Sequence, residues 1–84
     1  MNLNKQSVHL SDLKPGQKGI IKDLSACPDA SALMEMGCIP GEAITMVARA
    51  PLGDPITVKV SGYRLSLRKQ QAREIAIQEA ALVS

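Results

Sequence analysis

The side chains of this chain that could ligate a metal ion or act as nucleophiles are two cysteines and a single histidine. Cys27 and Cys38 lie eleven residues apart, and His9 precedes both. A structural zinc site uses four ligands in closely spaced pairs, and this chain has no C-x-x-C pair and no second histidine. We therefore expect no metal site and no cofactor, and we expect both thiols to pack as small apolar residues. A metal-sensing module built on His9, Cys27 and Cys38 is kept as an alternative.

The other polar residues form no recognisable catalytic set. Nucleophilic catalysis needs a serine or cysteine beside a histidine base and an orienting acid, and His9 stands near no glycine-framed nucleophile. The sequence also lacks the glycine-rich loops that bind phosphate and the paired histidines of zinc peptidases. Turn capping and solvation account for acidic residues such as Asp12 and Asp23. The sequence therefore predicts a protein that is not an enzyme.

Positive charge gathers in the second half of the chain. Residues 43–84 carry six Lys or Arg against three acids, whereas residues 1–42 carry four against five. This excess favours an acidic patch on a partner but is far from a phosphate-binding footprint. Proteins that bind single strands stack bases on aromatic side chains, and Tyr63 is the only aromatic residue here. We expect no nucleic acid. The alternative is a small nucleic-acid-binding barrel that uses Lys59, Arg64, Arg68, Lys69 and Arg73.

The element that would position the basic residues is a hairpin between Asp54 and Arg68. A two-residue Ser61-Gly62 loop between alternating runs is typical of a tight hairpin. With that loop, three apolar pairs share one face: Val60 with Tyr63, Val58 with Leu65, and Ile56 with Leu67. On the other face Lys59 stands opposite Arg64, with Arg68 further along. Opposed like charges are unfavourable unless they are solvated or meet an acidic partner, so this basic strip is a candidate contact surface.

Proline and glycine mark the other elements. The turns at 14–17 and 39–42 each place Pro then Gly as a type II turn requires, and they open strands at 19–24 and 43–49. In the second of these strands, Ile44, Met46 and Ala48 share a face. Residues 69–74 suit a helical or 3-10 turn, and a final strand follows at 75–78. The opening residues 8–13 suit a strand end and a turn.

A short helix is expected at residues 28–37. Ala30, Leu33, Met34 and Gly37 fall at helical spacing and form an apolar face that we expect to pack on the barrel. Asp29 suits the start of the helix and Gly37 a left-handed stop. Met36 lies off this face. A flexible thioether away from the core is a possible partner contact, or a cover for one end of the barrel.

Length and composition bound the fold to one small domain. The 84 residues are 45% hydrophobic with no Phe or Trp, so we expect a single domain over 1–84, with a core at about 8–78 built from aliphatic side chains. A core this small leaves little room for a cavity and favours a flat binding surface. The elements describe a mainly β fold, a small partly open barrel of about five strands with one short inserted helix and a short 3-10 turn. Residues 1–6 form no apolar targeting segment, which predicts a cytoplasmic protein with reduced thiols.

Four segments, in this order and at these spacings, resemble a known family. They are Leu13-Lys14-Pro15-Gly16, the run from Leu33 to Gly41, Pro51-Leu52-Gly53-Asp54-Pro55, and the run from Gly62 to Arg68. From about Leu10 to Gln78 the chain resembles the bacterial ferrous-iron transport protein A family. The family often carries basic residues before the position of Leu33, whereas this chain has Ser31-Ala32.

The resemblance implies a soluble SH3-like barrel that acts as an accessory protein. Its partner would be a large membrane ferrous-iron transporter with a cytoplasmic GTPase domain, whose assembly or activity it would modulate. Contact with the membrane would then be indirect, through that partner, and self-association is possible. We take nine residues as partner-binding candidates: Met34, Met36, Cys38, Ile39, Leu52, Asp54, Lys59, Arg64 and Arg68. Leu52 is open to two interpretations, because it either projects from its turn or folds back onto the end of the barrel.

Overall fold

The two proline-glycine turns set where the first long strands begin. In the computed structural model, which describes residues 8–79, the Gln17 amide donates to the Lys14 carbonyl (2.9 Å) and the Glu42 amide to the Ile39 carbonyl (3.0 Å). These bonds close both predicted turns. Strand β2 (Lys18–Asp23) follows the first turn and β3 (Ala43–Arg49) follows the second. Residues 1–6, where no targeting segment is expected, lie outside the described residues.

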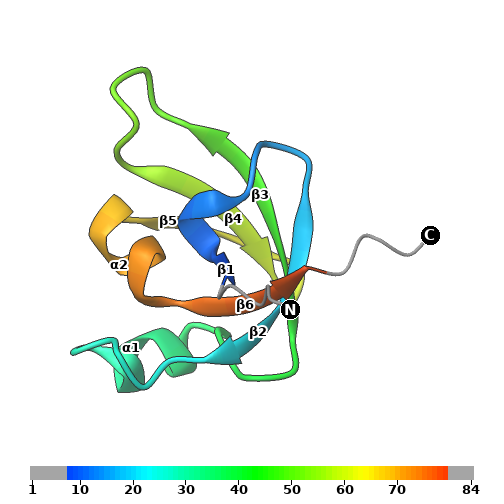
Figure 1. Ribbon diagram of the computed structural model, residues 1–84, viewed down its shortest axis with the longest axis vertical. Coiled ribbons are helices and arrows are strands. Elements are labelled where there is room, and N and C mark those ends of the chain that lie inside the picture. The colour runs from blue at the N-terminus through cyan, green and yellow to red at the C-terminus, as the bar shows by residue number, and fades with distance from the viewer. Residues whose placement is uncertain (1–7, 80–84) are drawn as a thin grey trace, which may run out of the picture.

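Six antiparallel strands form one curled sheet (Figure 1). The other strands are β1 (Val8–His9), β4 (Ile56–Val60), β5 (Tyr63–Leu67) and β6 (Ala76–Glu79), and the order across the sheet is β1-β6-β2-β3-β4-β5. The mainly β, partly open barrel is confirmed. The strand beyond the expected five is β1, whose two residues pair with β6 and lead into the 3-10 helix η1 (Leu10–Asp12).

The hairpin of β4 and β5 has the predicted register. Val60 pairs with Tyr63, and the ladder continues to Ile56 and Leu67, with Lys59 directly across from Arg64. Ser61 (φ 54°) and Gly62 (φ 82°) both adopt positive φ, as a type I′ turn requires. In β3 the predicted face is broken, because a bulge between Met46 and Ala48 leaves Ala48 exposed.

Two short helices complete the fold. Helix α1 (Ala30–Glu35) lies within the predicted range, and α2 (Lys69–Glu74) is an α-helix where a helical or 3-10 turn was expected. Helix α2 buries Ala72 completely and lies against η1. Among the described residues, no helix has the length and apolar character needed to cross a bilayer.

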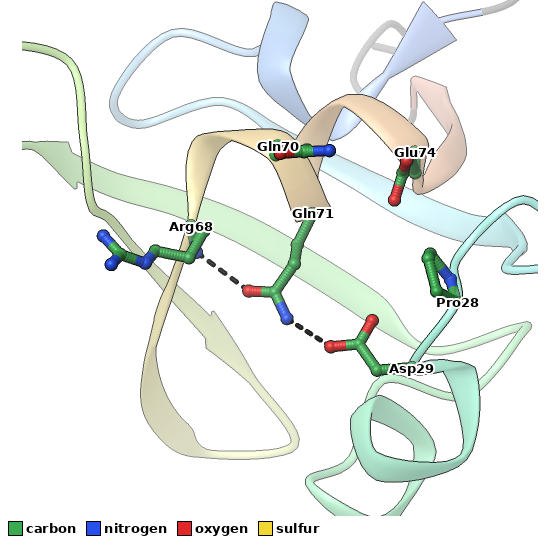
Figure 2. A pocket seen from close by; sticks show the side chains of 6 residues that line it. All are labelled: Pro28, Asp29, Arg68, Gln70, Gln71 and Glu74. Atoms are coloured by element: carbon green, nitrogen blue, oxygen red, sulfur yellow. Dashed lines mark hydrogen bonds between the residues drawn. The ribbon is translucent and has the colours of Figure 1, made fainter.

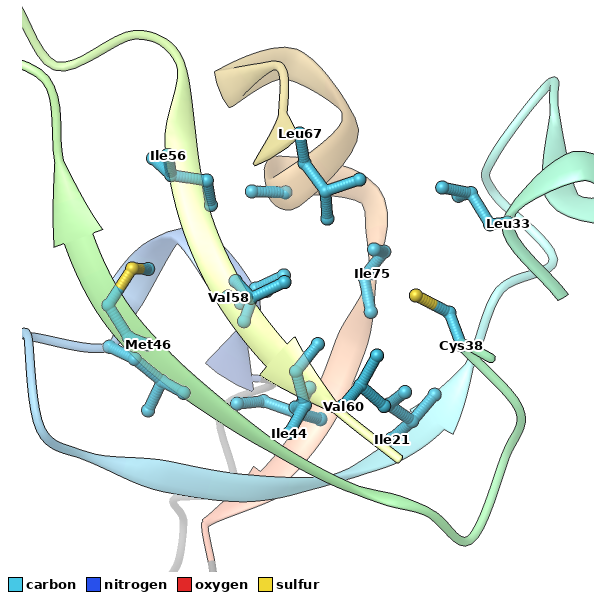
Figure 3. Packing of buried hydrophobic residues seen from close by; sticks show 14 of the residues in the cluster. Ile21, Leu33, Cys38, Ile44, Met46, Ile56, Val58, Val60, Leu67 and Ile75 are labelled. Carbon is cyan, nitrogen blue, oxygen red and sulfur yellow. The ribbon is translucent and has the colours of Figure 1, made fainter. Parts of the chain in front are cut away.

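The interior is filled by aliphatic and sulfur-containing side chains (Figure 3). Within residues 8–79 no polar or charged side chain is buried, and the prediction of a core without aromatic rings is confirmed. Tyr63 lies on the apolar face of its hairpin, yet 69% of its surface is exposed. The half-buried Arg49 side chain links β3 to the segment that follows β1. Its Nη2 atom donates to the carbonyls of Ser11 (2.7 Å) and Leu13 (2.6 Å).

Candidate partner-docking surfaces

The end of α1 separates side chains that face the core from those that face solvent. Gly37 (φ 107°) donates its amide to the Met34 carbonyl (3.0 Å), and Cys38 donates its amide to the Leu33 carbonyl (3.0 Å). This pair of bonds is a Schellman motif, in which a left-handed glycine reverses the chain and the two flanking apolar residues meet. Leu33 and Cys38 are accordingly buried in the core.

Three candidates remain exposed around this helix end, while the fourth does not. Met34, Met36 and Ile39 are 42%, 40% and 44% exposed. The expectation that Met34 packs on the barrel is wrong, because α1 is only six residues long and buries only Leu33. Cys38 is 0% exposed, so its place among the partner contacts is also corrected. The remaining exposed group, Met34, Met36 and Ile39, is called the α1 end.

The loop between β3 and β4 projects Leu52 into solvent. The Gly53 amide donates to the Ala50 carbonyl (2.7 Å), and this turn leaves Leu52 91% exposed, so the side chain does not fold back onto the barrel. Asp54 has a structural task in the same loop. One carboxylate oxygen accepts the Lys69 amide at the start of α2 (2.9 Å), and the other lies 3.9 Å from an Arg68 guanidinium nitrogen. These contacts tie the Leu52 loop to α2.

The outer face of the sheet carries a row of basic residues that crosses four strands. Lys18 pairs with Thr45, Thr45 with Lys59, and Lys59 with Arg64. Directly paired residues point to the same face, so Lys18, Lys59 and Arg64 form one basic row. Sequence reasoning missed Lys18, since its place depends on the β2–β3 register. The only ion pair found among the side chains of residues 8–78 joins Arg68 to Asp54, so the basic row has no acidic partner within that range.

The candidates therefore lie on separate surfaces. The Leu52 loop and α1 lie at opposite ends of the long axis of the molecule (Figure 1). The α1 end, by contrast, adjoins the hairpin turn, because a Cβ atom placed on Gly37 would lie 3.5 Å from the Ser61 hydroxyl oxygen. Met36 and Tyr63 thus come from neighbouring segments, and sequence reasoning did not count Tyr63 as a contact.

A hollow of about 310 Å³ lies between the start of α1 and α2 (Figure 2). The amide nitrogen of Gln71 donates to Asp29 (2.6 Å), and its amide oxygen accepts the Arg68 backbone N–H (2.9 Å). Pro28, Gln70 and Glu74 complete the lining. The volume is at the lower limit of small-molecule sites, so the surface is less flat than expected. The Gln71–Asp29 hydrogen bond joins α2 to the start of α1 across the hollow, while the Arg68–Gln71 bond lies within the first turn of α2.

The two cysteines and the histidine do not form a shared ligand set. Among residues 8–79, no three His, Cys, Asp or Glu side chains are placed to hold a metal ion. Burial raises the pKa of the Cys38 thiol, and burial together with the nearby carboxylates of Glu74 and Asp29 raises the pKa of Cys27. The Cys27 thiol also donates to the Glu74 carbonyl (3.5 Å). Protonated, buried thiols are poor metal ligands and poor nucleophiles.

Comparison with known proteins identifies the family. The FeoA domain model matches residues 8–79. A curated relative from Porphyromonas gingivalis, a fusion of Fe(2+) transport protein A with the Fe(2+) transporter FeoB, is 32% identical over 72 residues. The match covers 84% of this chain but 8% of the relative, so this chain spans only a small part of that protein's length.

Solved structures agree with both the family and the fold. The FeoA protein of Chlorobium tepidum is 33% identical, with a TM-score of 0.82 over 88% of this chain and 71% of that one. The FeoA of Stenotrophomonas maltophilia, solved with zinc and described as a prokaryotic SH3 domain protein, is 32% identical, with a TM-score of 0.69 over 84% and 89%. The SH3-like fold is thereby confirmed, and the names of these relatives belong to ferrous-iron transport.

Proposed function

This chain belongs to the FeoA domain family, and on that premise we propose that it is a cytoplasmic accessory protein of ferrous-iron uptake. It docks on the cytoplasmic, GTPase-bearing part of a membrane ferrous-iron transporter and modulates the assembly or activity of that transporter. It performs no chemical step of its own.

The observation that carries this proposal is the gene fusion. In Porphyromonas gingivalis a segment related to this chain is part of the same polypeptide as the transporter FeoB. A covalent link of this kind holds two modules at an effective concentration that reaches the millimolar range for short linkers, so even a weak contact is occupied. A chain that is not linked must achieve the same contact through surface residues alone.

Exposed apolar side chains supply such residues. The α1 end and Leu52 place aliphatic and thioether groups in solvent on a molecule whose accessible surface is only 5027 Å². Methionine is common at surfaces that bind protein partners, because its flexible thioether adapts to the opposing shape. Exposing these groups gains nothing for folding, whereas covering them on docking removes apolar area from water.

The test is capture of the transporter by variants at the two apolar surfaces. Met36→Asp and Leu52→Asp place a charge where apolar contact is proposed. Neither side chain belongs to the buried core, so we expect both variants to fold. We expect each to reduce co-purification of the transporter from solubilised membranes. The matched controls Met36→Leu and Leu52→Met keep apolar character and similar volume, and should capture as the unaltered chain does. Equal capture by both Asp variants would rule out these surfaces as the docking site.

A further inference from the structure

Strand β5 lies at one edge of the sheet. Its one neighbour in the sheet order is β4, and no described residue pairs with its other edge. Four of the five residues of β5, from Tyr63 to Ser66, are exposed or half-buried, and only Leu67 is buried. An unpaired edge presents a row of backbone N–H and C=O groups that another extended chain can pair with.

The hairpin register tells which backbone groups point outward. A two-residue turn closes with a hydrogen-bonded pair, here Val60 with Tyr63, and such pairs alternate along an antiparallel ladder. Leu65 and Leu67 therefore bond to β4 like Tyr63. The N–H and C=O groups of Arg64 and Ser66 point away from β4, toward the open edge. Two residues thus offer four backbone groups to an incoming strand.

The side chains beside this edge differ between its two faces. On the outer face stands the basic row, which reaches the edge at Arg64. On the inner face are Tyr63, mostly exposed, and Leu65, which packs partly against the core. The α1 end adjoins the hairpin turn, since a Cβ atom on Gly37 would lie 3.5 Å from the Ser61 hydroxyl oxygen. Successive side chains of a strand added here would point in turn to the basic outer face and to the apolar inner face.

We propose that the β5 edge binds an extended segment of the partner, in which acidic and apolar residues alternate. The segment adds as an antiparallel or parallel strand beside Arg64 and Ser66, with its acidic residues facing the basic row and its apolar residues facing Tyr63 and Leu65. This inference rests on the proposed docking function and specifies the surface and chemistry of the contact.

Other occupants fit this edge less well. Two copies of the chain paired edge to edge would bring two basic rows together, which opposes self-association at this site. Lipid headgroups and nucleic acids satisfy positive charge but cannot continue a backbone ladder. The combination of free backbone groups and a basic row favours an acidic polypeptide segment.

The test removes one outward N–H without touching the β4 ladder. Ser66→Pro deletes the amide that faces the open edge, and proline is tolerated on edge strands when its missing N–H faces solvent. Ser66→Ala is the matched control, since it keeps the amide. With purified transporter as the probe, we expect Ser66→Pro to weaken binding about tenfold or more and Ser66→Ala to stay within about twofold. Lys59→Glu should weaken binding as well.

The outcomes separate the edge proposal from the docking function. Equal binding by all variants would overturn the edge proposal and leave docking intact, whereas no binding by the unaltered chain would overturn docking itself. Loss of binding with Lys59→Glu but not with Ser66→Pro would indicate a purely electrostatic contact and would overturn strand addition. If Ser66→Pro fails to fold, hydrogen exchange on the unaltered chain decides. Exchange of the Arg64 and Ser66 amides should slow on complex formation, and unchanged exchange would contradict the proposal.

Discussion

Cys38 and Cys27 are free thiols whose surroundings oppose ionisation. Both lie in the core, and burial is the first cause of the raised pKa of each. A thiolate formed in place would lose its hydration without gaining a positive partner. These residues therefore pack as apolar side chains between α1, β2 and α2. Their thiols become reactive only when the chain unfolds around them.

The raised thiol pKa values predict how stability depends on pH. The unfolded chain ionises its thiols near their ordinary pKa of about 8.5, while the folded chain does so only at higher pH. The contribution of the two thiols to the free energy of unfolding should stay constant through neutral pH and decline above about pH 8.5. Urea denaturation of the unaltered chain and of the Cys27→Ala/Cys38→Ala variant checks this. The variant should show a shallower decline, and an identical decline in both would contradict the assignment.

Single residues were predictable where their role depends on near neighbours in the sequence. Gly37 at the end of α1 and the pairing of Lys59 with Arg64 follow from local spacing. The position of Asp29 at the start of α1 does too, but its side chain bonds to Gln71, far along the chain, and does not cap the helix. Exposure was less predictable, as Met34 and Cys38 show. Whether such a side chain reaches the core depends on where a six-residue helix lies against the barrel, which no local pattern states.

The hairpin of β4 and β5 is the element on which the docking proposal depends most. Its turn holds Ser61 and Gly62 at positive φ, a conformation that costs most L-residues energy but suits asparagine and glycine. The turn fixes the register, and the register in turn decides that Lys59 and Arg64 face outward and that Arg64 and Ser66 offer their backbone to the edge.

Substitutions in this turn should change stability in opposite directions. Ser61→Asn should raise the free energy of unfolding by about 0.5 kcal/mol, because asparagine tolerates the left-handed conformation. Gly62→Ala should lower it by about 1 kcal/mol, because a Cβ atom is strained there. Urea denaturation measures both. A Gly62→Ala variant as stable as the unaltered chain would show that the turn is not type I′.

Elements were predictable where alternation and turn residues agree, as in the hairpin and the two proline-glycine turns. They were not predictable where long-range pairing decides. Strand β1 has two residues and exists through its pairing with β6, and the exposure of Ala48 follows from a bulge opposite β4. The basic row shows the same limit, since Lys18 joins it only through the β2–β3 register.

At the scale of the whole molecule, the apolar candidates lie too far apart for a single small contact. A standard interface covers about 800 Å² on each partner, roughly one sixth of this molecule's 5027 Å² surface. The β5 edge meets the basic row at Arg64 and the α1 end at the hairpin turn, whereas the Leu52 loop lies at the other end of the molecule from α1 (Figure 1). Two faces allow a small barrel to contact two parts of a larger transporter.

The docking function is tested most directly by measuring the affinity of the purified chain for the purified transporter in lipid nanodiscs. We predict saturable binding with a dissociation constant of about 10 µM or tighter, which the unlabelled chain displaces and Met36→Asp weakens. The absence of saturable binding at about 100 µM chain, with a transporter that still binds GTP, would contradict the account.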